Sequence, residues 1–250
     1  MKEQKDCTYD EGIVAFVDIL GFSEYIKKEE HTPNKVSNIF EFMKKIIYLY
    51  SDGKIGGVKI AFFSDSCILT TNNLSISGFE TIMMTHYIIN SAIYQNIGLL
   101  TRGAVSLGKY YNKDNIAFGS GIIDAYEQEK YSKHTRTIIS HSLIEKFGDE
   151  IIKTSVVEKD VDGFYYYNFY LLEMADAVKD GNIDVTKAKE ILLKGKDQID
   201  FLIKKYLYTL CTDKYIWLIT PFNKACLCME KEFKGQGFEK LVINIEDYQF

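Results

Sequence analysis

A short apolar run near the N-terminus, residues 12–18 (GIVAFVD), constrains the fold more than any other segment. It is bounded by acidic residues and has no polar face, which is typical of a strand buried on both sides in the centre of a sheet. The run ends in Asp18. A carboxylate beside a buried strand is costly unless it is paired with a cation or binds a metal. We therefore expect a central strand that carries a functional aspartate at its end.

The segments that follow this strand predict an α+β fold. Thr32-Pro33 is a good helix start, and apolar residues spaced three and four apart come after it. Residues 57–71 predict two strands folded about the polar triplet Ser64-Asp65-Ser66. Further elements are expected as a helix over 77–97, a strand over 99–108, a strand over 115–119 and a helix over 122–131. The order is that of a ferredoxin-like βαββαβ sheet, with helices expected on one face.

The rest of the chain predicts a different organisation. Short strands are expected over 135–140, 151–157 and 164–172, with a helix between the first two that ends at Gly148. Two longer helices, over 184–206 and 212–232, and a last strand over 239–245 are expected to follow. We treat residues 1–170 as a core domain and residues 171–250 as a mainly helical C-terminal region packed on it.

Composition and charge exclude several classes of function. The 250 residues are 46% hydrophobic, which is enough to bury a core, and the net charge of −5 provides no overall basic surface for nucleic acid. The N-terminus is charged, and no apolar stretch reaches the roughly 20 residues of a membrane span. The odd number of cysteines, five, fits a reducing compartment. We expect a cytoplasmic protein with no membrane span and no nucleic-acid partner.

Asp65 is the second candidate carboxylate. It lies at the tip of a hairpin whose arm neighbours the first strand in the predicted sheet, so Asp18 and Asp65 are expected to converge. Two convergent aspartates suit Mg²⁺ or Mn²⁺. Such a site can bridge triphosphate oxygens and activate a hydroxyl for in-line attack on phosphorus. The alternative is that Asp18 caps the next helix and Asp65 is an ordinary turn residue.

Four segments resemble the class III adenylate and guanylate cyclases, in that family's order over about residues 12–130. The first is the aromatic-x-Asp-Ile-x-Gly-Phe-Ser run around Asp18, and the second is the hairpin around Asp65, with Ser64 where the family has glycine. The third and fourth are weaker matches. They contain, respectively, Arg102 with Gly108, and Gly119 with Ala125 and Glu129.

The resemblance implies a nucleotide cyclase core that binds a nucleoside triphosphate. It also implies a homodimer with sites at the interface and two metal ions, Mn²⁺ or Mg²⁺, per site. In the family the metals bind through both aspartates and a backbone carbonyl, which map here to Asp18, Asp65 and Ile19.

Several positions depart from the purine-specific pattern of that family. The acidic base-reading position is Ile116, the ribose-orienting asparagine is Ile123, and the arginine that stabilises the transition state is Glu127. The other base-reading position is Lys59, which fits a substrate-binding role but equally fits a solvent-facing strand lysine. Arg102 is the candidate for a replacement phosphate clamp and catalytic cation, with a surface or ion-pair arginine as the alternative.

Cyclase metal motifs combined with eroded purine-reading positions resemble the bacterial pyrimidine cyclases of the Pycsar antiphage systems. This likeness implies conversion of UTP or CTP to cUMP or cCMP and pyrophosphate, with the product read by a downstream cyclic-nucleotide effector. The loss of the asparagine and arginine positions leaves a second hypothesis, a catalytically inactive nucleotide-binding or dimerisation module. A third is a phosphotransferase built on a similar sheet.

Overall fold

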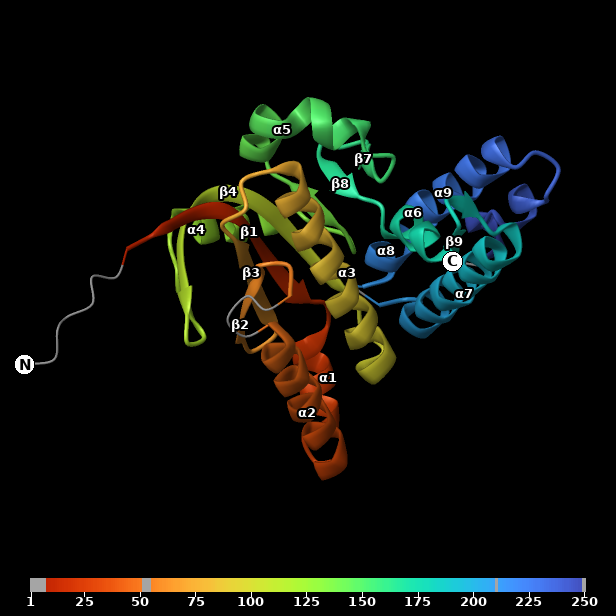
Figure 1. Ribbon diagram of the computed structural model, residues 1–250. Helices are drawn as coiled ribbons and strands as arrows, with labels where there is room; N and C mark the ends of the chain where they lie inside the picture. The colour runs from red at the N-terminus through yellow and green to blue at the C-terminus, as the bar shows by residue number, and fades with distance from the viewer. Residues whose placement is uncertain (1–7, 51–54, 210, 249–250) are drawn as a thin grey trace, which may run out of the picture. The chain divides into compact units, whose positions relative to one another are not determined.

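The strand β1 (Asp10–Ile19) lies at the centre of the sheet, as its apolar run predicts. In the computed structural model of the chain (Figure 1), β1 pairs antiparallel with both β3 (Ser66–Thr71) and β4 (Thr101–Lys113). The hairpin partner β2 (Lys59–Phe63) lies beyond β3. The resulting order, β2-β3-β1-β4, is that of a split βαβ unit. The predicted α+β, ferredoxin-like fold is therefore confirmed.

Helices cover both faces of this sheet, so the prediction of helices on one face is wrong. On one face α3 (Ile76–Ile97) reaches Thr101 through a hydrogen bond of its His86. On the other face α4 (Ser120–Glu129) lies against β4, where the Ser106 hydroxyl donates to the Gly121 carbonyl at 2.8 Å. Two helices precede β2, namely α1 (Phe22–Glu29), which the sequence did not predict, and α2 (Pro33–Tyr50).

A buried histidine joins α3 to two strands. His86 is fully buried, and its ring nitrogens lie 2.8 Å from the Thr101 hydroxyl and 2.9 Å from the Thr137 hydroxyl. The Thr101 hydroxyl donates to the Asn90 side chain at 2.8 Å, so it accepts from Nε2–H of His86, and the Thr137 hydroxyl donates to Nδ1. Burial lowers the pKa of His86 to about 3, so the ring is neutral in the folded chain at neutral pH.

We expect acid to destabilise the fold through His86. In the unfolded chain the pKa of His86 is about 6.5, so the unfolded state binds a proton on this ring below that pH. In the folded state the ring stays neutral until the pH falls to about 3. The free energy of unfolding should therefore fall by about 2 kcal/mol between pH 7 and pH 5 from this residue alone. Urea unfolding of His86→Gln should lack that part of the slope, whereas His141→Gln, at an exposed position, should keep it. Equal slopes for wild type and His86→Gln would contradict the prediction.

The sheet is extended beyond β4 by short strands. β6 (Thr137–Ile139) pairs parallel with β4, β8 (Tyr165–Tyr167) pairs with β6, and β7 (Val157–Lys159) is at the edge. A hairpin arm, β5 (Ile116–Phe118), pairs with the far end of β4.

Two predictions in this region are wrong. The helix expected to end at Gly148 continues as α5 (His141–Lys153), because Leu143 and Ile151 share its buried face, so residues 151–153 are helix and not strand. The strand expected over 164–172 stops at Tyr167, because the Asn168 side chain accepts hydrogen bonds from the backbone amides of Tyr170 and Leu171 and so starts α6 (Phe169–Glu173).

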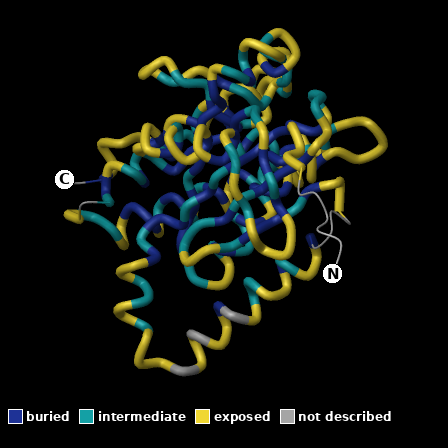
Figure 2. Tube along the Cα trace, turned by 90° about the vertical axis from the view of Figure 1, so that its left-hand side faces the viewer, coloured by how far each residue is buried: buried dark blue, intermediate teal, exposed yellow. Residues whose placement is uncertain are grey.

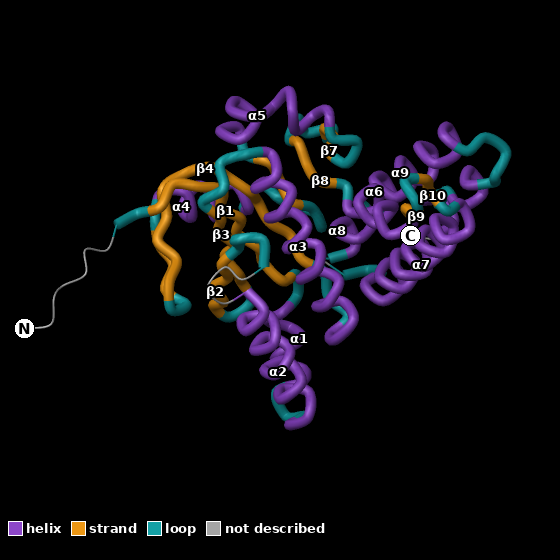
Figure 3. The backbone as a smooth tube through the Cα atoms, viewed as in Figure 1, coloured by secondary structure: helices purple, strands orange, loops and turns teal. Residues whose placement is uncertain are grey.

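Contacts divide the chain into two units. The first contains Met1–Ser132 and Arg136–Tyr167, and buried residues run along its central strands (Figure 2). The second contains Lys133–Thr135 and Asn168–Phe250, and is mostly helical (Figure 3). The structure describes residues 8–50, 55–209 and 211–248. Among these residues no helix has both the length and the apolar character that crossing a bilayer requires.

The second unit is built around α7 (Val185–Tyr206), as predicted. The helix expected over 212–232 is divided into α8 (Thr212–Ile216) and α9 (Ile219–Glu232). The strand expected over 239–245 is absent. The Asn223 side chain donates to the carbonyl of Ile243 and accepts from its amide, both at 2.8 Å, and these are the backbone groups that a neighbouring strand would otherwise bond. The smaller elements are η2 (Met174–Ala177), β9 (Val178–Lys179), β10 (Asn182–Ile183), η3 (Phe238–Leu241) and η4 (Ile245–Asp247).

Candidate active site

The fold brings the backbones of the two predicted carboxylates side by side. Asp18 pairs with Ser66 across the β1–β3 ladder, and the amide of the next residue, Ile19, donates to the carbonyl of Asp65 at 2.9 Å. Ser64, which stands where the cyclases have glycine, adopts a left-handed conformation (φ 54°) that glycine adopts more readily. The turn that carries Asp65 thus forms without a glycine at this position.

Arg102 lies between Asp18 and a third carboxylate, Glu129. It is paired with Asp18 across the β1–β4 ladder, and its Nε donates to Asp18 Oδ2 at 3.2 Å. The same Nε lies 2.7 Å from Oε1 of Glu129, the last residue of α4. Its Nη1 donates to the carbonyl of Ser132 at 3.3 Å. A role for Arg102 as a phosphate clamp, which stays a prediction, would require some of these contacts to open.

Glu129 is the most deeply buried of the three carboxylates. Its side chain is 5% exposed, against 20% for Asp18. Burial raises the pKa of Glu129, the guanidinium of Arg102 opposes that rise, and the negative charges of Asp18 and Asp65 add to it. Asp18, Arg102 and Glu129 therefore form one charged cluster joined through the guanidinium, and the charge of Asp65 acts on Glu129 from further away.

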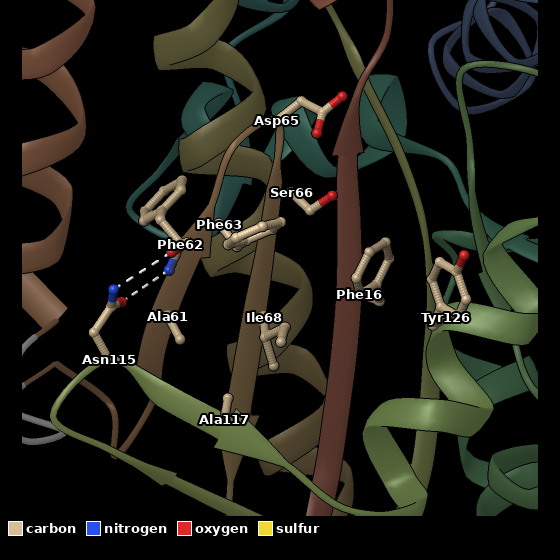
Figure 4. Close-up of a pocket in the computed structure, with 10 residues that line it drawn as sticks. All are labelled: Phe16, Ala61, Phe62, Phe63, Asp65, Ser66, Ile68, Asn115, Ala117 and Tyr126. Atoms are coloured by element: carbon tan, nitrogen blue, oxygen red, sulfur yellow. Dashed lines mark hydrogen bonds between the residues drawn. The ribbon is translucent and has the colours of Figure 1, made fainter.

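An aromatic pocket with a volume of about 530 Å³ opens beside this cluster (Figure 4). Phe16, two residues before Asp18 on the same face of β1, meets Tyr126 of α4 edge to face at 5.2 Å between ring centroids. Asn115 closes the other side by bonding the free backbone groups of Phe62 at the edge of the sheet. The lining residues are Phe16, Ala61, Phe62, Phe63, Asp65, Ser66, Ile68, Asn115, Ala117 and Tyr126. Apolar and aromatic walls with a few polar groups suit a planar ring.

The remaining predicted positions do not line this pocket. Lys59 begins β2 opposite Thr70, and Ala61 on the same strand is a lining residue. Ile116 begins β5 and is exposed. Ile123 and Glu127, one turn apart, lie on the exposed side of α4. The assignment of Lys59 to substrate binding stays a prediction.

The chemistry of these donors fits a hard divalent cation. Asp18 and Asp65 offer only oxygen atoms, which Mg²⁺ and Mn²⁺ prefer. Within the described part of the chain no three His, Cys, Asp or Glu side chains are grouped so that they could hold a metal ion. A metal here would therefore take its other ligands from backbone carbonyls, water or the oxygens of a triphosphate.

No family model and no curated protein matches this chain. Among solved structures, the guanylyl cyclase domain of the RhoGC fusion protein from the aquatic fungus Blastocladiella emersonii is 17% identical, with a TM-score of 0.48 over 64% of this chain and 95% of that chain. The adenylyl cyclase CyaB from P. aeruginosa is 17% identical, with a TM-score of 0.43 over 64% and 94%. A class III adenylyl cyclase-like ATP-binding protein from Pseudomonas aeruginosa is 14% identical, with a TM-score of 0.42 over 55% and 35%. Structural similarity at these identities and TM-scores does not show what reaction this chain carries out. That depends on the residues of its own site.

Two features of the site were missed from the sequence. Glu129 and Tyr126 both belong to the last cyclase-like segment, but neither was given a role. Both lie on α4, which the predicted fold placed on the wrong face of the sheet. The hydrophobic spacing of a helix shows which of its sides is buried, but it does not show which face of a sheet covers that side. The glycines at positions 108 and 121 were the available signal, because they allow α4 to approach β4 closely.

Proposed function

We propose that this chain is a metal-dependent nucleotide cyclase. It would convert a nucleoside triphosphate, UTP or CTP, to the 3′,5′-cyclic monophosphate and pyrophosphate. The observation that supports this proposal is the juxtaposition of Asp18 and Asp65 at one end of an aromatic pocket. A nucleotide needs a pocket for its planar base and, beside it, carboxylates whose bound metal ions can hold its phosphates.

The residues of the chain have distinct parts in this proposal. Asp18 and Asp65 would hold the metal ions and fix the triphosphate, while Phe16 and Tyr126 would face the base. Two Mg²⁺ or Mn²⁺ ions, when bound, would lower the pKa of the ribose 3′-hydroxyl and neutralise phosphate charge. The 3′-hydroxyl would lose its proton to water, its oxygen would form a bond to the α-phosphorus, the bond from that phosphorus to the oxygen bridging to the β-phosphate would break, and pyrophosphate would leave with the electron pair.

The pyrimidine preference rests on the acidic base-reading position of the purine cyclases, which is Ile116 here and offers no hydrogen bond. The other two departures concern the ribose and the transition state: Ile123 offers no hydrogen bond, and Glu127 carries the wrong charge to stabilise a phosphate. A pyrimidine cyclase would supply cUMP or cCMP to a downstream effector, as in Pycsar antiphage defence.

A homodimer belongs to the same proposal. Aromatic and aliphatic side chains are exposed on the elements that border the pocket and on the opposite face of the sheet, where the rings of Tyr9 and Tyr111 contact Phe118 at 5.7 and 5.0 Å between centroids. Such patches mark interaction surfaces. The exposed members are Tyr9, Phe63, Ile116, Phe118, Ile123 and Tyr126.

Mass spectrometry of the products formed with Mn²⁺ and all four nucleoside triphosphates tests the proposal. Sedimentation first establishes whether the protein is a dimer. We expect cUMP or cCMP as the main product, because Ile116 cannot form the hydrogen bond that the acidic base-reading residue of the purine cyclases forms. A main product of cAMP or cGMP would keep the cyclase and refute the pyrimidine preference. A folded dimer that forms no cyclic product would refute the enzyme.

The rival function is a nucleotide-binding or dimerisation module without turnover. The presence of isoleucine at position 123 and glutamate at position 127 favours it, since both cyclase groups are missing. Retention of both aspartates favours the enzyme, because a module that only binds has little need for two convergent carboxylates. Thermal stabilisation by a nucleoside triphosphate and metal, with no product formed, would identify the module.

A further inference from the structure

Arg102 is shared between two carboxylates that belong to different elements. Its Nε lies 3.2 Å from Asp18 Oδ2 on β1 and 2.7 Å from Glu129 Oε1 on α4. Nε carries a single hydrogen, and the hydrogen bond it forms is the one to Asp18. Glu129 Oε1, although closer, makes no aligned hydrogen bond. Glu129 is therefore close enough to accept a hydrogen bond from Arg102, but Arg102 does not form that bond while its Nε–H donates to Asp18.

The cluster has more negative than positive charge. Asp18 and Glu129 both lie against the guanidinium of Arg102, which leaves a formal charge of −1 when all three groups are ionised, while Asp65 and Lys130 act on Glu129 from further away with opposite signs. A divalent cation bound at Asp18 would be attracted by this excess of negative charge, but it would repel a guanidinium bonded to the same carboxylate. Arg102 must then release Asp18, and the nearest place for its charge is Glu129.

We propose that Glu129 is a positioning residue that takes Arg102 away from Asp18 when a divalent cation binds, and so sets the cation affinity of the site. The inference rests on the proposed function, because it assumes that Asp18 is a metal ligand. Glu129 suits this task because its side chain is buried and fixed at the end of α4, so it cannot follow the cation out of the cluster. Without the negative charge of Glu129, Arg102 remains bonded to Asp18 and competes with the metal.

A double-mutant cycle on Mn²⁺ affinity tests the proposal. The affinity of the nucleotide-free protein is measured by electron paramagnetic resonance of unbound Mn²⁺ for wild type, Glu129→Gln, Arg102→Gln and the double variant. Glu129→Gln should weaken Mn²⁺ binding about tenfold, as changes in groups that orient metal ligands commonly do. In the Arg102→Gln chain the same change should cost less than about twofold, because no guanidinium remains to be moved.

The controls separate this proposal from its rivals. Glu127→Gln, on the exposed side of the same helix, should leave Mn²⁺ affinity unchanged. An equal loss from Glu129→Gln in both backgrounds would mean that Glu129 acts on the cation directly, and no loss in either would mean that it only supports the fold. Both results overturn the proposal.

Two further outcomes are covered. If Glu129→Gln does not fold, Glu129→Asp replaces it, and should weaken Mn²⁺ about threefold in the wild-type background only, because its carboxylate is one methylene further from Arg102. If wild type binds no Mn²⁺, or Asp18→Asn binds it equally well, the metal site of the proposed function is wrong and this proposal falls with it. Mn²⁺ binding that needs Asp18 but shows no coupling between Arg102 and Glu129 overturns this proposal alone.

Discussion

Replacing Asp18 by asparagine is expected to lower the rate of cyclic-nucleotide formation by at least about 100-fold. Asparagine keeps the shape of the side chain and removes the charge that holds a divalent cation, which contributes several kcal/mol to the stabilisation of the transition state. Asp65→Asn should have an effect of similar size, because both carboxylates lie at the same end of the pocket. The measurement is the initial rate of product formation with saturating Mn²⁺ and nucleotide.

Asp10→Asn is the matched control for these variants. Asp10 lies on β1 and on the same face as Asp18, but at the opposite, exposed end of the strand, so its variant should retain the wild-type rate within about twofold. The fold should survive Asp18→Asn, because Arg102 still has Glu129 within 2.7 Å. Circular dichroism and the melting temperature check this. A folded Asp18→Asn or Asp65→Asn variant with full activity would show that the carboxylate assignment is wrong.

The parts of the fold that could be predicted are those in which local pattern and burial agree. The run at residues 12–18 is apolar on both sides because β1 is covered on both faces, and the hairpin around Asp65 has its polar residues at the turn. These two features also brought Asp18 and Asp65 together in the prediction, since a strand end and a neighbouring hairpin tip meet wherever the strands pair. The ferredoxin-like order then followed from the alternation of elements.

The elements that were wrongly predicted depend on contacts between distant residues. Asn168 ends a strand by capping a helix, and Asn223 takes the backbone groups of Ile243 that a neighbouring strand would have bonded. Both side chains act through hydrogen bonds that the hydrophobic pattern does not record. The interaction of Glu129 with Arg102 is of the same kind, because it depends on which face of the sheet α4 covers.

The second large expected effect is a loss of stability and activity in Gly108→Ala, at the close contact between α4 and β4. A Cβ at position 108 would lie 2.7 Å from the Cα of Gly121, which is backbone and cannot rotate away. Helix and strand must therefore separate, at a cost of about 1–3 kcal/mol. The melting temperature should fall by about 3–10 °C.

Activity should fall with stability in this variant, because α4 carries both Tyr126 of the pocket and Glu129 of the cluster. We expect a loss of at least about tenfold in the rate of product formation, since displacements near 1 Å can cost more than that. Gly148→Ala is the control: its Cβ would meet only the Cγ2 methyl of Ile144, at 3.3 Å, and alanine favours a helix over glycine by about 1 kcal/mol. It should leave activity unchanged and the melting temperature equal or higher. If Gly108→Ala instead had the melting temperature and the rate of product formation of wild type, the close contact of α4 with β4 would not be what positions Tyr126 and Glu129.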